Sequence, residues 1–164
     1  MPQATTPLAV LGAGSWGTAL AIQFARAGRT TRLWSRDRQQ SVAMAQTRRN
    51  DRYLPEAAFP AGLTVAADLP VALDGAADVL IAVPSHGLRA LLREIAPLLR
   101  AETRLAWATK GFELDTGLLP HQVAAEVLGT ARPQAVLSGP TFAREVGAGL
   151  PTAMTVASAD AGYA

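Results

Sequence analysis

Three glycines near the N-terminus stand at a spacing that can bind a dinucleotide. Gly12, Gly14 and Gly17 form a G-x-G-x-x-G pattern directly after the apolar run 8–11. That run is too short for a helix and predicts a buried strand, whereas the apolar positions that follow the glycines recur at helical intervals. A strand, a tight glycine turn and a helix form the context in which this spacing binds dinucleotides.

Each of the three glycines has its own predicted task. Gly12 permits the sharp turn out of the strand, Gly14 lets the backbone approach a pyrophosphate, and Gly17 lets the helix pack against the sheet. The helix directs unpaired N–H groups and the positive end of its dipole at the phosphates. The alternative interpretation is a glycine-rich turn without a ligand.

A second candidate group follows the predicted strand 30–34, at the place where dinucleotide-binding folds usually meet the adenosine ribose. Arg36, with a hydroxyl neighbour, suits the 2′-phosphate of NADP, whereas Asp37 would suit the free 2′-hydroxyl of NAD. Asp37 with Gln40 also matches a capping box that opens a helix to Arg49. We therefore assign Asp37 to the cap and Arg36 to the phosphate, which favours NADP(H) over NAD(H). A solvated arginine is the alternative.

Lys110 is the single lysine among 15 basic residues, the other 14 being arginine. The planar guanidinium group of arginine cannot replace a compact ammonium group where a point charge must meet a small substrate. Lys110 follows the predicted strand 103–109, and we expect it at a substrate; chance use of one lysine is the alternative. His86, near a predicted helix start, is expected to face solvent, and His121 is a weaker candidate still for acid–base chemistry.

Composition excludes several classes of protein. Hydrophobic residues make up 49% of the 164 positions, which excludes a disordered chain, and the absence of cysteine excludes disulfides and thiolate chemistry. The two histidines lie far apart, so no metal site is expected. A net charge of +2 does not predict nucleic-acid binding. Without a signal peptide in residues 1–7 or an apolar membrane span, the chain is predicted to be cytoplasmic.

Strands and helices alternate along the whole chain, which predicts one α/β domain over residues 1–164. We expect a doubly wound, mostly parallel, Rossmann-like sheet with helices on both faces. The predicted strands cover residues 8–11, 30–34, 63–66, 78–83, 103–109, 134–137 and 152–157. Residues 50–62, with two prolines and a glycine, are predicted to form a loop, and Ser85 is predicted to cap the helix that follows it. Ligands gather at the carboxyl ends of such strands, where the candidate residues lie.

The last residues, 158–164, contain a cap-like Ser158 or Asp160 that would begin another helix, and then the sequence stops. This pattern predicts a truncated chain or a separately expressed domain.

Several longer motifs occur in a particular order. They are GAGSWGTALA at 12–21, YLP at 53–55, VPSH at 83–86, ATKG at 108–111, SGPTFAREV at 138–146 and LPTA at 150–153. With these motifs the chain resembles, from about Pro7 to its end, the first half of the bacterial-type NAD(P)-dependent glycerol-3-phosphate dehydrogenase family. The glycine turn alone is shared with many dehydrogenases, whereas the later motifs are far more particular.

The resemblance implies roles for individual residues. The cofactor would be contacted by the glycine turn and by Ser15, Trp16, Arg36 and Ala143, and Lys110 would lie between cofactor and substrate. Gly139 and Thr141 would meet the phosphate or the hydroxyls of the substrate, the glycine through its N–H and the threonine through its hydroxyl. Trp16 could cover the nicotinamide side of the cleft or fill core space.

The reaction implied by the resemblance is hydride transfer between the nicotinamide and dihydroxyacetone phosphate, which yields sn-glycerol 3-phosphate for phospholipid synthesis. The general acid/base of the family is a second lysine in a C-terminal helical substrate domain. Because Lys110 is the only lysine here, that residue and that domain are absent from these 164 residues, and none of them is assigned as catalytic. We expect the chain alone to bind dinucleotide and to convert substrate slowly or not at all. For the full-length protein a homodimer is an open alternative.

Two other functions fit part of the sequence. A stand-alone module that senses NADP(H), or regulates a partner without chemistry, would suit the short length. A reductase of a different keto acid would share the glycine turn and the arginine, but it would leave the segment 138–143 unexplained.

Overall fold

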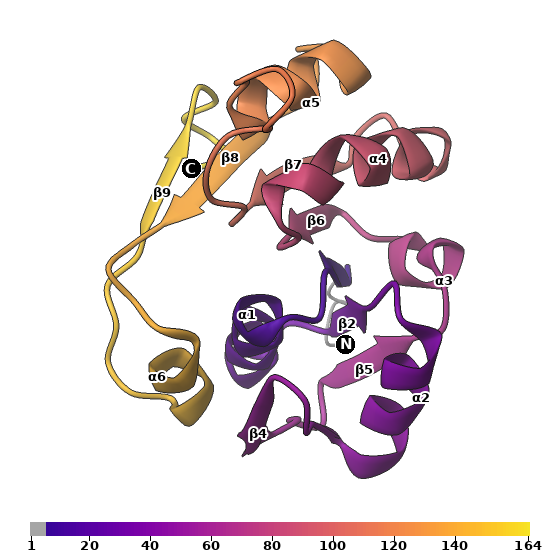
Figure 1. Ribbon diagram of the computed structural model, residues 1–164, viewed down its shortest axis with the longest axis vertical. Coiled ribbons are helices and arrows are strands. Elements are labelled where there is room, and N and C mark those ends of the chain that lie inside the picture. Colours follow the sequence, from indigo (N-terminus) through magenta and orange to yellow (C-terminus); the bar gives the residue numbers. More distant parts are fainter. Residues whose placement is uncertain (1–5) are drawn as a thin grey trace, which may run out of the picture.

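The structure, a computed structural model, describes residues 6–164 and is built on one seven-stranded sheet (Figure 1). Residues 1–5, which form most of the segment without signal-peptide features, lie outside the described residues. The strand order in the sheet is β5-β2-β1-β6-β7-β8-β9. These strands are β1 (Leu8–Leu11), β2 (Thr31–Trp34), β5 (Leu63–Ala66), β6 (Asp78–Ile81), β7 (Arg104–Trp107), β8 (Gln134–Ser138) and β9 (Thr155–Ser158).

All neighbours in the sheet are parallel except β8 and β9, which are antiparallel. The inner strand β1, third in this order, is buried along its whole length, because helices cover both of its faces. Its residue Val10 stands opposite Leu33 of β2 and Leu80 of β6. The predicted doubly wound, mostly parallel sheet is therefore confirmed.

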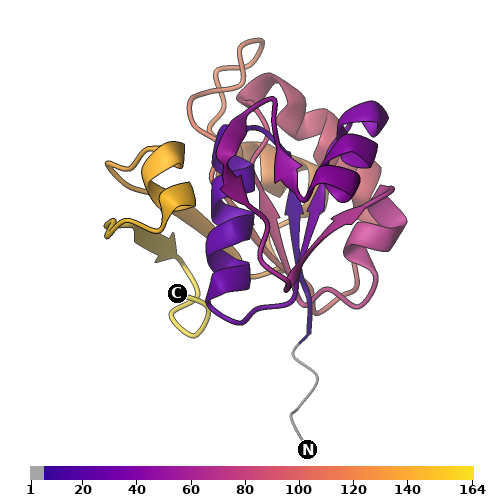
Figure 2. The ribbon, with the colours of Figure 1, turned by 90° about the horizontal axis from the view of Figure 1, so that it is seen from below.

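Helices form one layer on each face of the sheet. The first layer contains α1 (Ser15–Arg26), α2 (Arg38–Thr47) and α6 (Ala143–Ala148), and the second contains α3 (Leu69–Leu73), α4 (Ser85–Ile95) and α5 (Pro120–Leu128). A short 3₁₀ helix, η1 (Ala96–Leu98), which contains Pro97, continues α4. Within the first layer α6 packs against α1, and Figure 2 shows the two helices side by side.

The prediction of a loop over residues 50–62 is wrong. The segment contributes to a separate antiparallel pair of strands, β3 (Arg49–Asn50) and β4 (Leu54–Ala58). Leu54 is fully buried and Ala57 nearly so, and both belong to the core that α1 and α6 share. The proline content misled the prediction, since a two-stranded pair consists of edges, where proline is tolerated.

Two helix starts test the capping predictions. Asp37 caps α2 as expected, because its side chain accepts hydrogen bonds from the N–H groups of Gln39 and Gln40. Gln40 does not complete a capping box, since its amide turns toward the carbonyl oxygen of Ala13 instead. The prediction that Ser85 caps α4 is wrong: Ser85 is the first helical residue, and Pro84 occupies the cap position without a side-chain bond.

The end of the chain leaves the sheet and returns to it. β8 leads to α6, and the chain comes back as β9, which starts three residues later than predicted. Residues 158–164 form a turn in which the Asp160 carboxylate accepts hydrogen bonds from the N–H groups of Gly162 and Tyr163. Among residues 6–164, no helix combines the length and the apolar character that crossing a bilayer requires.

Candidate dinucleotide-binding site

A cleft of about 690 Å³ opens at the carboxyl ends of β1, β2, β6 and β7. The segment between β8 and α6 completes its wall. Eight of the predicted site residues line this one cleft: Gly12, Gly14, Ser15, Trp16, Arg36, Lys110, Thr141 and Ala143. The topology therefore brings together groups that are more than 100 residues apart in the sequence.

The glycine turn has the geometry that its spacing predicts. Gly12 has a φ of 115°, and a Cβ there would lie 2.7 Å from the carbonyl oxygen of Ala82. A Cβ on Gly17 would lie 1.9 Å from the carbonyl oxygen of Gly12, so glycine is required where the helix meets the turn. A Cβ on Gly14 would meet no atom within 4 Å, since Gly14 faces the open cleft. The turn thus presents bare backbone to a ligand.

Arg36 and Asp37 have different environments at the end of β2. The Asp37 carboxylate is occupied by the cap of α2 and forms a 3.4 Å ion pair with Arg52. The exposed Arg36 guanidinium reaches toward the first turn of α4, where its Nη2 lies 3.9 Å from the place of a Cβ on Gly87. Arg36 is therefore the charged group at this edge that is not committed to the helix cap.

Lys110 and Trp16 face each other across the cleft. The Lys110 Nζ lies 5.9 Å from the centroid of the Trp16 ring, within the range of a cation–π contact. Trp16 also packs against the first core layer, so it both fills core space and lines the cleft. This position is compatible with both interpretations that the sequence left open, a ring that covers the nicotinamide side of the cleft and a ring that fills core space.

Two polar atoms of the cleft wall are buried without a protein partner. The Nε1 of Trp16 and the Oγ1 of Thr141 have no hydrogen bond to residues 6–164. Buried polar groups are nearly always paired, so an unpaired one indicates a bound group or a strained site. Both atoms belong to residues that line the cleft.

Gly139 lies outside the cleft lining. A Cβ at this position would stand 2.6 Å from the carbonyl oxygen of Ala153 and 3.2 Å from the Cα of Met154. Glycine is required here because two chain segments cross, the one leaving β8 and the one returning to β9. Its contact with substrate stays a prediction.

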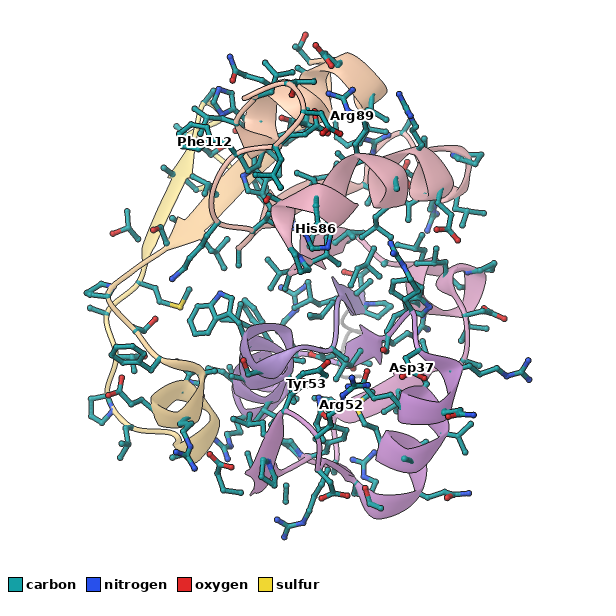
Figure 3. The ribbon with its side chains drawn as sticks, in the orientation of Figure 1. Asp37, Arg52, Tyr53, His86, Arg89 and Phe112 are labelled. Carbon is teal, nitrogen blue, oxygen red and sulfur yellow. The ribbon has the colours of Figure 1, made fainter. Side chains whose placement is uncertain are left out.

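Sequence reasoning missed four residues of the cleft and of the wall behind it. Arg52, Tyr53 and Gln40 line the cleft, and Asn50 is buried behind the glycine turn. Arg52 lies over the ring of Tyr53 at 5.0 Å, and Figure 3 shows both residues beside Asp37. The motif YLP includes Tyr53 but indicates no role for it. The wrong prediction of a loop over residues 50–62 concealed Asn50 and Arg52.

Positive charge dominates the cleft wall. Arg36, Arg52 and Lys110 line it, and Asp37 is the sole carboxylate among its lining residues. His86 is exposed, as expected, and also borders the cleft near the start of α4 (Figure 3). A wall of this charge suits an anionic ligand such as a phosphorylated nucleotide.

The loop that follows Lys110 is held by ion pairs. Arg89 of α4 binds the Glu113 carboxylate through two hydrogen bonds of 2.8 Å and reaches Glu126 of α5 at 2.7 Å. The hydrogen bond from Arg89, assisted by one from Thr116, lowers the pKa of Glu113 to about 2. The same contact with Glu113 raises the pKa of Arg89. The segment from Lys110 to Glu113 is therefore tied to the helix whose first turn borders the cleft.

A larger cavity of about 830 Å³ lies beside α5 and the strands β7 to β9. None of the predicted binding residues lines it, although His121 does. We place the site in the smaller cleft because the glycine turn, Arg36 and Lys110 converge there. Within residues 6–164, no group of three His, Asp or Glu side chains is arranged to hold a metal ion.

The parallel sheet, the glycine turn and the basic cleft define the class of α/β nucleotide-binding domains. The family model described as the NAD-dependent glycerol-3-phosphate dehydrogenase N-terminus matches residues 7–164, and the chain belongs to this family.

Curated relatives carry the name glycerol-3-phosphate dehydrogenase (NAD(P)+). The protein from Thioalkalivibrio sulfidiphilus is 52% identical over 158 residues, which are 96% of this chain and 47% of the relative. That from Yersinia pestis is 52% identical over 153 residues, covering 93% of this chain and 45% of the relative. The chain thus spans about half the length of the curated relatives it matches.

Solved structures agree with the sequence comparisons. The glycerol-3-phosphate dehydrogenase of Coxiella burnetii superimposes with a TM-score of 0.92 at 45% identity, over 97% of this chain and 48% of that one. The enzyme of Saccharomyces cerevisiae has a TM-score of 0.82 at 22% identity, over 94% and 47%, and shows the shared fold alone.

Proposed function

We propose that this chain binds NADP(H), with NAD(H) as the second choice, in the cleft at the carboxyl ends of β1, β2, β6 and β7. The observation that carries the proposal is the convergence of the glycine turn, Arg36 and Lys110 on one basic cleft. The names of the curated relatives, which give both cofactors, support it.

The cofactor lies, in this proposal, along the glycine turn. The backbone of Gly12 and Gly14 and the first turn of α1 with Ser15 and Gly17 hold the pyrophosphate side, and Trp16 is a further cofactor contact. Arg36 binds the 2′-phosphate, because the carboxylate of Asp37 is already occupied by the cap of α2. Ala143 returns to the cofactor from the start of α6.

We further propose that the complete protein interconverts dihydroxyacetone phosphate and sn-glycerol 3-phosphate for phospholipid synthesis. The nicotinamide, when bound, supplies or accepts the hydride. Lys110 brings positive charge to the substrate, and Thr141 and Gly139 offer a hydroxyl and a backbone N–H to its polar groups. None of these 164 residues is assigned as the general acid/base, so the reaction is proposed for the chain joined to the further length that its relatives carry.

The same proposal includes the substrate class, the cellular location and the partners of the protein. The substrate is a small molecule, the location is the cytoplasm, and no nucleic acid is bound, since the net charge is only +2. A homodimer of the full-length protein stays a prediction.

Titration calorimetry of the purified chain tests cofactor binding directly. We expect heat of binding from NADPH and a weaker response from NADH. Amine-directed labelling then tests the substrate side, because Lys110 competes only with the N-terminus. NADPH with glycerol 3-phosphate should slow the labelling of Lys110 but leave the N-terminus unchanged. Absence of heat from both coenzymes contradicts the cofactor proposal, and unchanged labelling of Lys110 contradicts its role.

A further inference from the structure

A buried hydrogen-bond network lies directly behind the glycine turn. Asn50 is fully buried, and its Nδ2 donates to the carbonyl oxygen of Ala13 at 2.9 Å and to the Oγ1 of Thr18 at 2.7 Å. The Nε2 of Gln40 donates to the same Ala13 oxygen at 2.9 Å and to the Oδ1 of Asn50 at 3.3 Å. One backbone oxygen inside the turn thus accepts hydrogen bonds from two side chains.

This anchored oxygen determines the direction of the next N–H group. In a trans peptide the C=O and the following N–H point in opposite directions. Because the Ala13 oxygen is held toward the interior, the Gly14 N–H points the other way, toward the cleft that Gly14 lines. Among residues 6–164, no acceptor takes this N–H.

We propose that Asn50 and Gln40 are positioning residues that aim the Gly14 N–H at the pyrophosphate of the bound nucleotide. The inference rests on the proposed cofactor binding. A buried amide that loses its partners is costly, so a network in which every member is paired favours one arrangement of the turn. The turn is then preorganised before the ligand arrives, which spares the ordering cost of binding.

The network also reaches the edge where the 2′-phosphate is proposed to lie. The Oγ of Ser35 donates to the Oε1 of Gln40 at 2.7 Å and accepts a hydrogen bond from the N–H of Asp37 at 3.2 Å. The residues on both sides of Arg36 are therefore tied to the same amide that holds the Ala13 carbonyl. Gln40 therefore supports both the glycine turn and the edge where the 2′-phosphate is proposed to lie, whereas Asn50 supports the turn alone.

Asn50→Asp removes the donor to Ala13 at constant size. We expect NADPH affinity to fall at least about tenfold, since the Ala13 oxygen keeps only its hydrogen bond from Gln40 and faces a carboxylate in place of the lost donor. Adenosine 2′-monophosphate, which has the 2′-phosphate but no pyrophosphate, should bind Asn50→Asp and the unchanged chain equally well. Calorimetry with both ligands, and circular dichroism to verify folding, give the two affinities.

Gln40→Met is the second variant in case the buried carboxylate prevents folding. It is neutral and similar in volume, and it removes one of the two bonds to Ala13, so NADPH affinity should fall about threefold. Gln39→Met is the matched control, because Gln39 is the exposed neighbour on α2 and its side chain takes no part in the network. We expect it to bind NADPH like the unchanged chain.

The outcomes separate the two proposals. Undiminished NADPH binding by folded Asn50→Asp, or by Gln40→Met, overturns the positioning role. An equal loss for NADPH and adenosine 2′-monophosphate in Asn50→Asp overturns it as well, because general damage would then explain the result. If the unchanged chain binds no coenzyme, the proposed function itself fails, and that is seen before any variant is made.

Discussion

The adjacent residues Arg36 and Asp37 provide a direct test of cofactor choice. Asp37 is committed to the cap of α2, whereas the exposed guanidinium of Arg36 faces the cleft. Arg36→Asp should weaken NADPH binding by about 1.5–3 kcal/mol, because a charge-assisted bond to phosphate is replaced by repulsion. NADH, which lacks the 2′-phosphate, should lose less in a fluorescence titration. Equal losses for the two coenzymes would refute the assignment of Arg36.

The glycines of the turn form a second, matched pair of substitutions. Gly17→Ala places a Cβ 1.9 Å from the Gly12 oxygen, so the helix or the turn must shift. We expect a loss of at least about 2 kcal/mol in the free energy of unfolding, measured with urea. Gly14→Ala meets open space at a helix N-cap with a φ of −74°, so its stability should stay near that of the unchanged chain.

The same pair should separate in coenzyme binding. The Cβ of Gly14→Ala occupies the space in front of the turn and should reduce NADPH affinity although the fold is intact. A destabilised Gly14→Ala, or one that binds NADPH normally, would contradict the view that this space is reserved for a ligand.

The loop after β7 is the element that carries Lys110, and its attachment can be measured. Arg89→Met removes both hydrogen bonds to Glu113, so hydrogen exchange in residues 110–119 should accelerate. Arg93→Met is the comparison variant, since Arg93 lies one turn further along α4, forms no ion pair within residues 6–164, and acts on Glu113 only through its charge. Similar exchange in the two variants would show that the ion pair does not hold the loop.

The attachment of this loop should also depend on pH in a defined direction. The pKa of Glu113 is lowered to about 2 by Arg89 and Thr116, so the charged form is favoured in the folded state. Stability from the pair is fully present above the ordinary glutamate pKa of about 4.5 and is lost as pH falls through about 2. Exchange of residues 110–119, corrected for its intrinsic rate, should therefore be slow above about pH 4.5, accelerate progressively as pH falls below that value, and level off below about pH 2. Acceleration already at about pH 5 would contradict the lowered pKa.

Elements with strong local patterns were predictable from the sequence, and elements defined by tertiary contacts were not. The buried run of β1, the apolar period of α4 and the glycine turn follow from the order of residue types. The pair β3–β4 does not, because two prolines hide a strand whose Leu54 is buried only through α6 and α1. The common contact of Asn50 and Gln40 escaped prediction for the same reason, since their shared partner, the Ala13 carbonyl, is distant in the sequence. The signal available in the sequence was that Asn50 is its single asparagine.

At the scale of the whole molecule, the two ends of the parallel strands have different tasks. The carboxyl ends form the cleft, and the amino ends hold an ion-pair cluster around Asp78, where β6 begins. The Asp78 carboxylate binds Arg104 of β7 through bonds of 2.7 and 2.9 Å and Arg29 at 3.0 Å. Tyr163, near the end of the chain, lies 5.0 Å from the Arg104 guanidinium, and burial raises its pKa to about 12. Segments from four parts of the chain therefore meet at this end.

This separation predicts that stability and binding can be changed independently. Asp78→Asn keeps the size of the side chain but leaves Arg29 and Arg104 without their charge partner. The cost should be about 2 kcal/mol, below the 3–5 kcal/mol typical of fully buried pairs. The reduction follows because the side chains of Arg29 and Arg104 are 38% and 41% exposed.

Urea unfolding measures that cost, and Asp74→Asn, at an exposed position that forms no ion pair within residues 6–164, is the control. NADPH affinity of folded Asp78→Asn should stay within about twofold of the unchanged chain, because sites this far apart that share no partners act additively. A large loss of NADPH affinity would mean that the two ends of the sheet are coupled, and the cleft could then no longer be treated as a rigid site on an independent scaffold.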